Sequence, residues 1–266
     1  MSALREIAHD SLSLREPAFL KHYRRGAFKE WNGIAFWTSE LPGPGFNFAS
    51  VLRPDVPKLD ELLPIAREWF AHCEQGWGIL VEGDAGHPME AELRARDWII
   101  AEDEPAFVMD PISTGINPAA HQELAIHPIR TEADMQAFAH VACSAFGSPL
   151  EFASMMMPSL AFATDPRMYW AIGECDGEPV TVSGYSRSGD TAVVSCVATL
   201  ESHRGRSFGA AMTNHILANA AAQGCTSASL RSGPKSIPLY ERLGFKYVCQ
   251  HRTYTEPSEP LAASQR

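Results

Sequence analysis

The stretch Leu200-Glu-Ser-His-Arg-Gly-Arg-Ser-Phe-Gly-Ala-Ala-Met212 decides the fold of this 266-residue chain. It follows Thr191 to Thr199, whose β-branched and nearly continuous apolar character predicts a central strand. It leads into a helix, because apolar residues from Phe208 to Ala220 recur at intervals of three and four. A strand, a loop with Gly and Arg, and a helix start predict an anion-binding turn.

Three features of this turn favour phosphate. The first turn of a helix leaves backbone N–H groups unpaired, and the helix dipole favours negative charge there. Glycines such as Gly205 and Gly209 let the backbone approach phosphate oxygens closely. Arg204 and Arg206 can add charge-assisted hydrogen bonds. The sequence therefore predicts a phosphate site at this helix start.

Two motifs, in order and at fitting spacing, resemble the GNAT acetyltransferase superfamily. Arg204-Gly-Arg-Ser-Phe-Gly-Ala210 is similar to the family's pyrophosphate loop, which reads Arg or Gln, two residues, Gly, one residue, then Gly or Ala. Ser207 stands where the middle glycine is usual. Pro238-Leu-Tyr-Glu-Arg-Leu-Gly-Phe245 resembles the family's Tyr-x-x-Leu-Gly-Phe segment. The resemblance covers roughly Leu124 to Thr255.

The resemblance implies acetyl-CoA as co-substrate and indicates the residues that would contact it. The pantetheine arm would pair with backbone where the central strand diverges from its neighbour, and the pyrophosphate would lie on the Arg-Gly loop. Arg231, Ser232 and Ser236 follow the next strand and are candidates for the pantetheine or adenosine end. The cofactor-binding residues expected in this way are Val197, Ala198, Thr199, Arg204, Gly205, Arg206, Ser207, Phe208, Gly209, Ala210 and Ser236.

The resemblance also implies a mechanism in which an amine attacks the thioester directly in a ternary complex. Tyr240 occupies the place of the usual proton donor to the leaving thiolate, and a phenol is a suitable acid for that step. The alternative for Tyr240 is an aromatic that packs between helix and sheet. No general base is assigned, because the carboxylates near the relevant strands and loops are expected to be solvated; they are Glu151, Glu174, Asp190 and Glu201.

An internal repeat predicts the domain organisation. A helix, a glycine stop and a short strand occur around Gly76 and again around Gly224, and an aromatic before or in the next strand follows each at a similar distance. We therefore expect an α/β (α+β) fold of two tandem GNAT-like units, each a mixed, mostly antiparallel sheet flanked by helices. The units would be residues 1–120 and 121–266, joined by a Pro- and Gly-containing linker at 111–121. The alternative is a chance alignment of two strand–helix–strand patterns.

The first unit is predicted to lack a cofactor site. At the position of the Arg-Gly loop it has Pro54-Asp-Val-Pro-Lys-Leu-Asp-Glu61, whose prolines remove amide donors and whose carboxylates repel a pyrophosphate. Leu93 stands at the position of Tyr240. A structural role, or one wall of the acceptor pocket, is expected. The clusters Trp31, Phe36, Trp37 and Met155-Met-Met-Pro158 fit core packing or an apolar acceptor cleft.

Composition narrows the function classes. With 22 basic and 32 acidic residues the net charge is −10, which disfavours nucleic acid and anionic membrane partners. No apolar run approaches the roughly 18 residues that cross a bilayer, and the N-terminus does not resemble a signal peptide. Six scattered cysteines indicate reduced thiols in a cytoplasmic protein, and no metal-type His or Cys spacing occurs, so no metal is expected.

These observations predict a GNAT-type N-acetyltransferase that moves an acetyl group from acetyl-CoA to a small-molecule amine. Two alternatives stay open: a non-catalytic acyl-CoA-binding or sensing module, and a transferase for another acyl donor. The identity of the acceptor and the oligomeric state are also left open.

Overall fold

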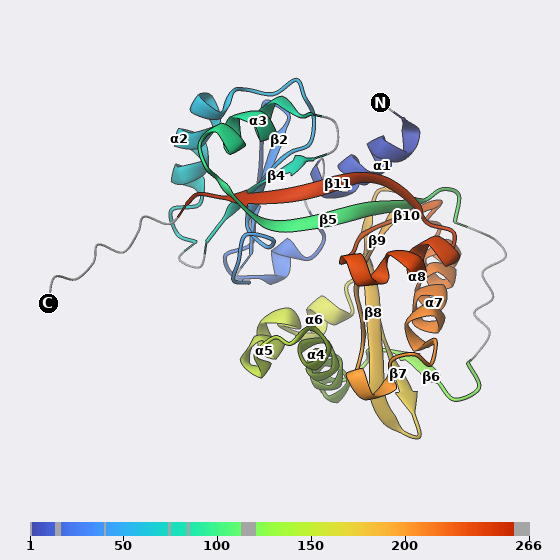
Figure 1. Cartoon of the computed structure of the whole chain (residues 1–266). Helices are drawn as coiled ribbons and strands as arrows, with labels where there is room; N and C mark the ends of the chain where they lie inside the picture. Colours follow the sequence, from blue (N-terminus) through green and yellow to red (C-terminus); the bar gives the residue numbers. More distant parts are fainter. Residues whose placement is uncertain are drawn as a thin grey trace, which may run out of the picture.

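The computed structural model describes residues 2–13, 17–39, 41–73, 76–83, 86–112 and 121–257. Its framework is one eleven-stranded mixed sheet with the strand order β1-β2-β3-β4-β11-β5-β10-β9-β8-β7-β6, flanked by helices (Figure 1). The strands are β1 (Ala27–Trp31), β2 (Ile34–Thr38), β3 (Phe48–Val51), β4 (Gly78–Glu82), β5 (Ile99–Met109), β6 (Ala125–Pro128), β7 (Met168–Cys175), β8 (Glu178–Ser188), β9 (Thr191–Thr199), β10 (Ser227–Arg231) and β11 (Lys246–Thr255). The α-helices are α1 (Ala3–Ser13), α2 (Leu59–Trp69), α3 (Pro88–Ala95), α4 (Glu132–Phe146), α5 (Ala153–Met156), α6 (Leu160–Ala163), α7 (Phe208–Ala222) and α8 (Ile237–Arg242).

The repeat predicted from the sequence is present in the fold. In the first half, β3 runs parallel to β4 with α2 between them in the chain, and α3 and β5 follow. In the second half, β9 runs parallel to β10 with α7 between them, and α8 and β11 follow. The remaining strand pairs are antiparallel. The predicted mixed, mostly antiparallel sheet with flanking helices is therefore confirmed.

The two halves exchange strands at the centre of the sheet. The C-terminal strand β11 lies between β4 and β5, and β5 of the first half lies between β11 and β10 of the second. Figure 1 shows these two long strands running side by side across the middle of the molecule. The division of the chain at residue 120 stays a prediction, because the two halves share this sheet, and residues 113–120 of the expected linker lie outside the described residues.

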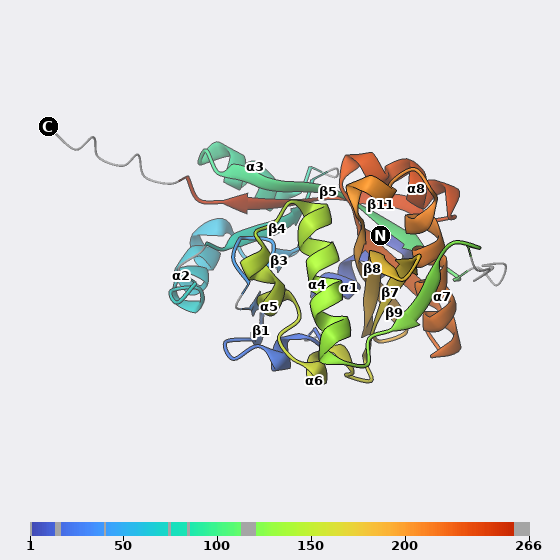
Figure 2. The same cartoon turned by 90° about the horizontal axis from the view of Figure 1, so that it is seen from below.

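The second half buries both faces of its sheet. Helix α7 covers one face and α4 the other, as Figures 1 and 2 show. The α4 helix begins at a capping box, in which the side chains of Thr131 and Asp134 accept hydrogen bonds from each other's backbone N–H groups. Of the apolar stripe expected on α7, Ala211 and His215 are only half-buried. The stripe members that are fully buried are Phe208, Met212, Ile216 and Ala220.

The first half packs around α2 and α3. The predicted aromatic cluster divides between the two faces of the sheet: Phe36 and Trp31 pack toward α2, whereas Trp37 packs on Phe48 on the other face. Packing is therefore the main role of these aromatics, and the same holds for Met157, which is buried beneath α4. None of the helices within the described ranges is long and apolar enough to cross a bilayer.

Candidate active site

A wedge opens between β9 and β10 in the second half. The two strands pair only from Thr191 to Val193 on β9, although β9 continues to Thr199. A bulge then bends β9, because Cys196 and Val197 together face the single residue Ser183 on β8. Cys196 has a backbone φ of 54° at this bulge. The divergence leaves a cleft of about 400 Å³, lined by residues 193–197 of β9 and by residues 229–233 at the end of β10 and in the turn after it.

The predicted pantetheine-contacting backbone lies along this wedge. Val197 lines the cleft. The Ala198 carbonyl instead accepts a hydrogen bond from the Thr181 hydroxyl of β8 at 2.8 Å. Since backbone groups of successive strand residues point to opposite edges, Val197 and Thr199 present theirs to the gap and Ala198 does not. Of the three residues expected to pair with the pantetheine arm, Val197 and Thr199 therefore remain the candidates. The Thr199 carbonyl also accepts a hydrogen bond of 3.3 Å from Arg204 Nε.

The Arg-Gly loop ends in an open helix start. Gly205 has a φ of 80°, and Ser207, the N-cap of α7, has a φ of 62° and a ψ of 13°. This left-handed conformation favours glycine, which explains why the related pattern carries glycine at the position of Ser207. The Ser207 hydroxyl makes no capping hydrogen bond. The N–H groups of Phe208, Gly209 and Ala210 thus form the unpaired first turn, and the first turn closes with Ala211 N–H donating to the Ser207 carbonyl at 3.0 Å.

The two arginines of the loop point to other partners. Arg204 donates to the Ala145 carbonyl at 2.9 Å and so braces the loop against the C-terminal end of α4. Arg206 forms an ion pair of 2.7 Å with Glu123, and its guanidinium lies 4.7 Å from the centre of the Phe208 ring. To reach a phosphate, either arginine would have to break the solvent-exposed contact that it makes here, which costs little free energy. The backbone of the loop, more than its side chains, is arranged for an anion.

Tyr240 lies on α8, lines the cleft and is only 5% exposed. Its ring contacts Phe107 of β5 and Phe245, with ring centres 6.2 and 5.8 Å apart. Burial raises the pKa of Tyr240 to about 12, so the phenol keeps its proton throughout the neutral range. Both sequence-based roles, packing aromatic and proton donor, fit this environment.

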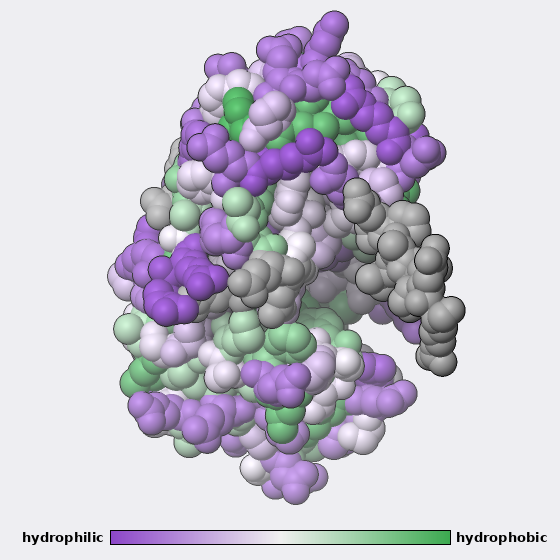
Figure 3. Space-filling model, turned by 90° about the vertical axis from the view of Figure 1, so that its left-hand side faces the viewer, coloured by the Kyte–Doolittle hydropathy of each residue, from purple (hydrophilic) through white to green (hydrophobic). Residues whose placement is uncertain are grey.

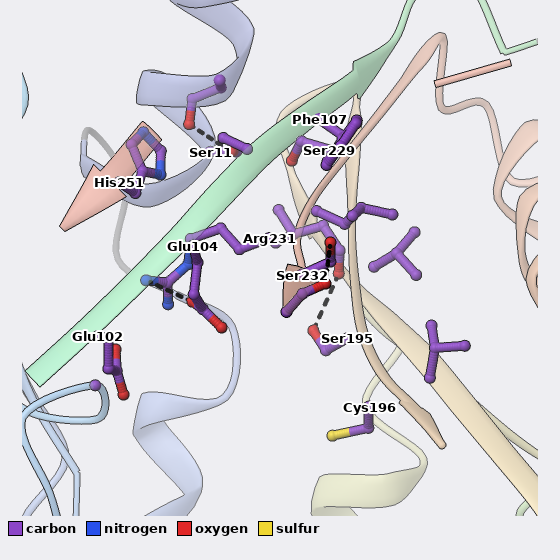
Figure 4. Close-up of a pocket in the computed structure, with 18 of the residues that line it drawn as sticks. Ser11, Glu102, Glu104, Phe107, Ser195, Cys196, Ser229, Arg231, Ser232 and His251 are labelled. Carbon is purple, nitrogen blue, oxygen red and sulfur yellow. Dashed lines mark hydrogen bonds and ion pairs between the residues drawn. The ribbon is translucent and has the colours of Figure 1, made fainter. Parts of the chain in front are cut away.

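Two carboxylates that the sequence reasoning missed face the wedge. Glu102 and Glu104 lie on β5 and line the cleft across from Ser195 and Cys196 of β9 (Figure 4). Glu104 forms an ion pair of 3.3 Å with Arg231. Glu102 accepts a hydrogen bond of 3.2 Å from the Thr253 hydroxyl. Burial raises the pKa of the Glu102 carboxyl above its usual range despite the nearby Arg231 charge.

The four carboxylates considered from the sequence are elsewhere. Among the described residues that line the cleft, none is Glu151, Glu174, Asp190 or Glu201. Glu174, for example, pairs with His127 between β6 and β7. The signal for the missed pair was the spacing of Glu102 and Glu104, which puts both on one face of a strand. Their approach to the site depends on the strand exchange, which no local pattern predicts.

The mouth of the cleft is apolar. Phe46 of the first half and Phe146 at the end of α4 both line it, and they are 45% and 54% exposed. In the space-filling view, hydrophilic residues dominate the outer rims, while more hydrophobic ones gather near the hollow between the upper and lower parts of that face (Figure 3). Arg231, Ser232 and Ser236, expected from the sequence to approach the cofactor, also line the cleft. The cleft therefore combines polar walls with exposed aromatic side chains.

Comparisons with known proteins agree with this geometry. Residues 135–245 match the model of the acetyltransferase (GNAT) family, and the match ends where β11 begins. No curated protein matches the sequence.

Solved structures share the whole fold at low sequence identity. The chain is similar to a GCN5-related N-acetyltransferase from Kribbella flavida, with a TM-score of 0.71, 20% identity and 98% of each chain covered. It is similar to a GCN5-related N-acetyltransferase from Sphaerobacter thermophilus, with a TM-score of 0.59, 13% identity and 86% of this chain and 82% of that chain covered. A tandem GNAT protein from the clavulanic acid biosynthesis pathway matches with a TM-score of 0.58 and 13% identity over 89% of this chain and 86% of that one. The fold is that of a tandem GNAT protein.

Proposed function

We propose that the chain transfers an acetyl group from acetyl-CoA to the amine of a small molecule, because residues 135–245 match the model of the GNAT acetyltransferase family. The observation that carries the proposal is the wedge between β9 and β10, which leads to the open first turn of α7. The pantetheine arm would pair with Val197 and Thr199 in the wedge. The pyrophosphate would accept hydrogen bonds from the N–H groups of Phe208, Gly209 and Ala210.

The walls of the cleft favour a cationic acceptor with an apolar part. Glu102 and Glu104 place two carboxylates near the thioester end of the wedge, where they would attract an ammonium group. Phe46 and Phe146 supply exposed aromatic surface, and the buried Trp37 also lines the cleft. The net charge of −10 acts in the same direction and against nucleic acid. An aryl- or alkyl-substituted primary amine fits this combination.

The reaction we propose assigns a group to each proton. The Glu102 carboxylate takes a proton from the ammonium, and the free amine attacks the thioester carbonyl carbon. The nitrogen of the tetrahedral intermediate then loses its extra proton to solvent. As the intermediate collapses, the C–S bond breaks, and the Tyr240 phenol donates its proton to the departing thiolate of coenzyme A. Solvent then returns a proton to the Tyr240 phenolate and accepts the one held by Glu102. Glu102 is suited to the first step because its raised pKa makes it a better base than a solvated carboxylate. A cytoplasmic setting, in which the six thiols of the chain stay reduced, is part of the proposal.

Coenzyme A binding provides the first test. Coenzyme A at saturating concentration should raise the melting temperature of the wild-type chain, because a ligand that binds only the folded state stabilises it. Arg204→Glu should abolish this rise, since a carboxylate there repels the pyrophosphate beside α7. Arg25→Glu, at an exposed position of the first half, is the matched control and should keep it. An unchanged melting temperature of the wild type would overturn the proposal.

Turnover is the second test. Release of thiol from acetyl-CoA should be measured across a set of amines that vary in charge and apolar content, with propionyl- and succinyl-CoA as alternative donors. Preferential turnover of cationic amines with an aryl or alkyl part supports the proposal. Coenzyme A binding with no thiol release from any amine would instead identify a sensing module, and preference for a longer donor would revise the acyl group.

A further inference from the structure

A buried cluster of nitrogen and sulfur ligands lies beside the cleft and takes no part in the proposed reaction. His9 comes from α1, and Cys249 and His251 come from β11. Their exposed fractions are 0%, 0% and 1%. Cys249 and His251 are two residues apart, so both side chains point to the face of β11 that α1 covers. Figure 4 shows the His251 ring beneath α1.

The distances within the cluster fit one metal ion. One ligand atom each from His9, Cys249 and His251 lies within 4.8 Å of the other two. Cys249 Sγ is 3.4 Å from His251 Nε2. Ligands bound tetrahedrally to zinc at about 2.0 to 2.3 Å lie about 3.3 to 3.8 Å from one another, so small side-chain rotations suffice to close the site.

A buried ring nitrogen of His251 also fits metal binding. His251 Nδ1 has no hydrogen-bond partner among the described residues. A buried polar atom of this kind costs free energy unless something pairs with it.

A carboxylate is positioned to orient one of the ligands. Glu82 of β4 lies opposite His251 in the sheet, and its Oε2 is 2.8 Å from His9 Nε2. Its other oxygen forms an ion pair of 2.6 Å with Arg5. Metal-bound histidines commonly donate their second ring N–H to such a carboxylate, which fixes the ring and strengthens the nitrogen as a ligand. His9 would then bind through Nδ1 and donate from Nε2 to Glu82.

We propose that His9, Cys249 and His251 bind one Zn²⁺ ion, with a water as the fourth ligand. A thiolate and two imidazoles favour Zn²⁺ over the oxygen-preferring Mg²⁺ and Ca²⁺. Binding releases the thiol proton of Cys249 to solvent. The ion would fasten α1 to β11, at the seam where the two halves of the sheet meet. Since His251 also lines the cleft, the ion and the water reach the site from the cleft side.

Metal content and cobalt substitution test the proposal, which does not depend on acetyl-CoA binding. The full chain, stripped with a chelator and incubated with excess Zn²⁺, should retain one zinc per chain after gel filtration, as measured by elemental analysis. With Co²⁺ in place of Zn²⁺ it should show a thiolate-to-cobalt charge-transfer band in the near ultraviolet. A wild-type chain that retains no metal, or that binds cobalt without this band, overturns the proposal.

Variants assign the ligands. Cys249→Ser should remove the charge-transfer band and weaken zinc binding about 100-fold or more, while Cys73→Ser, outside the cluster, should leave both unchanged. Glu82→Gln should weaken binding by about 10-fold to 100-fold and keep the band, because the thiolate is still present. Retention of the band in Cys249→Ser would overturn the assignment. Should Cys249→Ser fail to fold, the cobalt spectrum of the wild type decides the question by itself.

Discussion

The two halves of the sheet differ most where their parallel strands meet. In the first half β3 stays paired with β4 from Phe48 to Val51, which is its entire length. In the second half β9 leaves β10 after Val193 and continues for six further residues, to Thr199. A fully paired strand has no backbone groups to offer a ligand, whereas the diverging end of β9 does. Between these parallel pairs, the same topology therefore opens a wedge in the second half and none in the first.

The helix starts that follow these strands differ in the same way. In the first half the N–H of Leu59, at the start of α2, donates to the Glu92 carboxylate of α3 at 3.0 Å. In the second half the residue that corresponds to Glu92 is Leu239 of α8, which lies beside Gly209 at the start of α7. An internal carboxylate thus occupies the anion site of the first half, and an apolar side chain leaves that of the second half open.

The first half supports the site of the second. It contributes β5, with Glu102 and Glu104, and the aromatic residues Trp37 and Phe46, to a cleft whose wedge belongs to the second half. With the proposed function we therefore expect one coenzyme A per chain.

The largest effect is expected when the start of α7 receives a carboxylate like the one that Glu92 provides at the start of α2. In Leu239→Glu the new carboxylate would pair with the N–H groups of the first turn of α7, as Glu92 does in the first half. Loss of several charge-assisted hydrogen bonds and added repulsion should weaken coenzyme A binding about 1000-fold or more, measured by calorimetry. Leu239→Gln, without the charge, should lose much less. Similar losses in both would show that packing of Leu239, and not charge, keeps the site open.

Tyr240→Phe converts the proton donor into a packing aromatic, as Leu93 packs in the first half. We expect kcat to fall about 100-fold with the KM for acetyl-CoA unchanged, because only the transfer of a proton in the transition state is lost. Tyr247→Phe is the control, since its ring contacts the same Phe107 from an exposed position. An equal loss of kcat and cofactor affinity in Tyr240→Phe would favour the packing role.

Glu102→Gln removes the contribution of the first half to the chemistry. The base must be ionised to act, so kcat/KM of the wild type should fall as the pH drops through the raised pKa of Glu102, and this acid limb should be absent from the variant. Near neutral pH we expect a loss of roughly 10- to 100-fold, since water can relay the proton in part. Asp103→Asn, on the same strand but outside the cleft, should keep the profile. A pH profile unaltered in Glu102→Gln would exclude this carboxylate as the base.

Ser207→Gly should have the smallest effect, and it should stabilise the protein where the other changes cause a loss. Glycine adopts the left-handed conformation of Ser207 without steric cost, and this gain exceeds the extra chain entropy that glycine loses on folding. We expect the free energy of unfolding to rise by about 0.5 kcal/mol, measured by urea denaturation, with coenzyme A affinity retained. Ser207→Val should be destabilised, because a β-branched residue tolerates this conformation poorly. Weaker coenzyme A binding in Ser207→Gly would assign the serine hydroxyl a direct phosphate contact.

The sequence predicted the elements that carry local signals. The β-branched run of β9 and the Gly-containing loop before α7 each formed as expected, since turns and apolar periodicity act over a few residues. The repeat was readable for the same reason. The sequence did not predict that Arg204 contacts Ala145 or that Arg206 contacts Glu123, because these partners come from distant parts of the chain.

What the sequence alone determined is the side of the molecule for which we propose cofactor binding: a strand, a Gly-containing turn and a helix, contiguous in the chain and specified by local chemistry. Only the tertiary structure decided the side proposed for the acceptor. The exchange of β5 and β11 brings Glu102 to a wedge whose strands lie some ninety residues further along the chain. It also brings Cys249 and His251 to His9, which lies near the opposite end of the chain. Pairing between distant strands depends on burial and register across the whole sheet, and no short pattern encodes it.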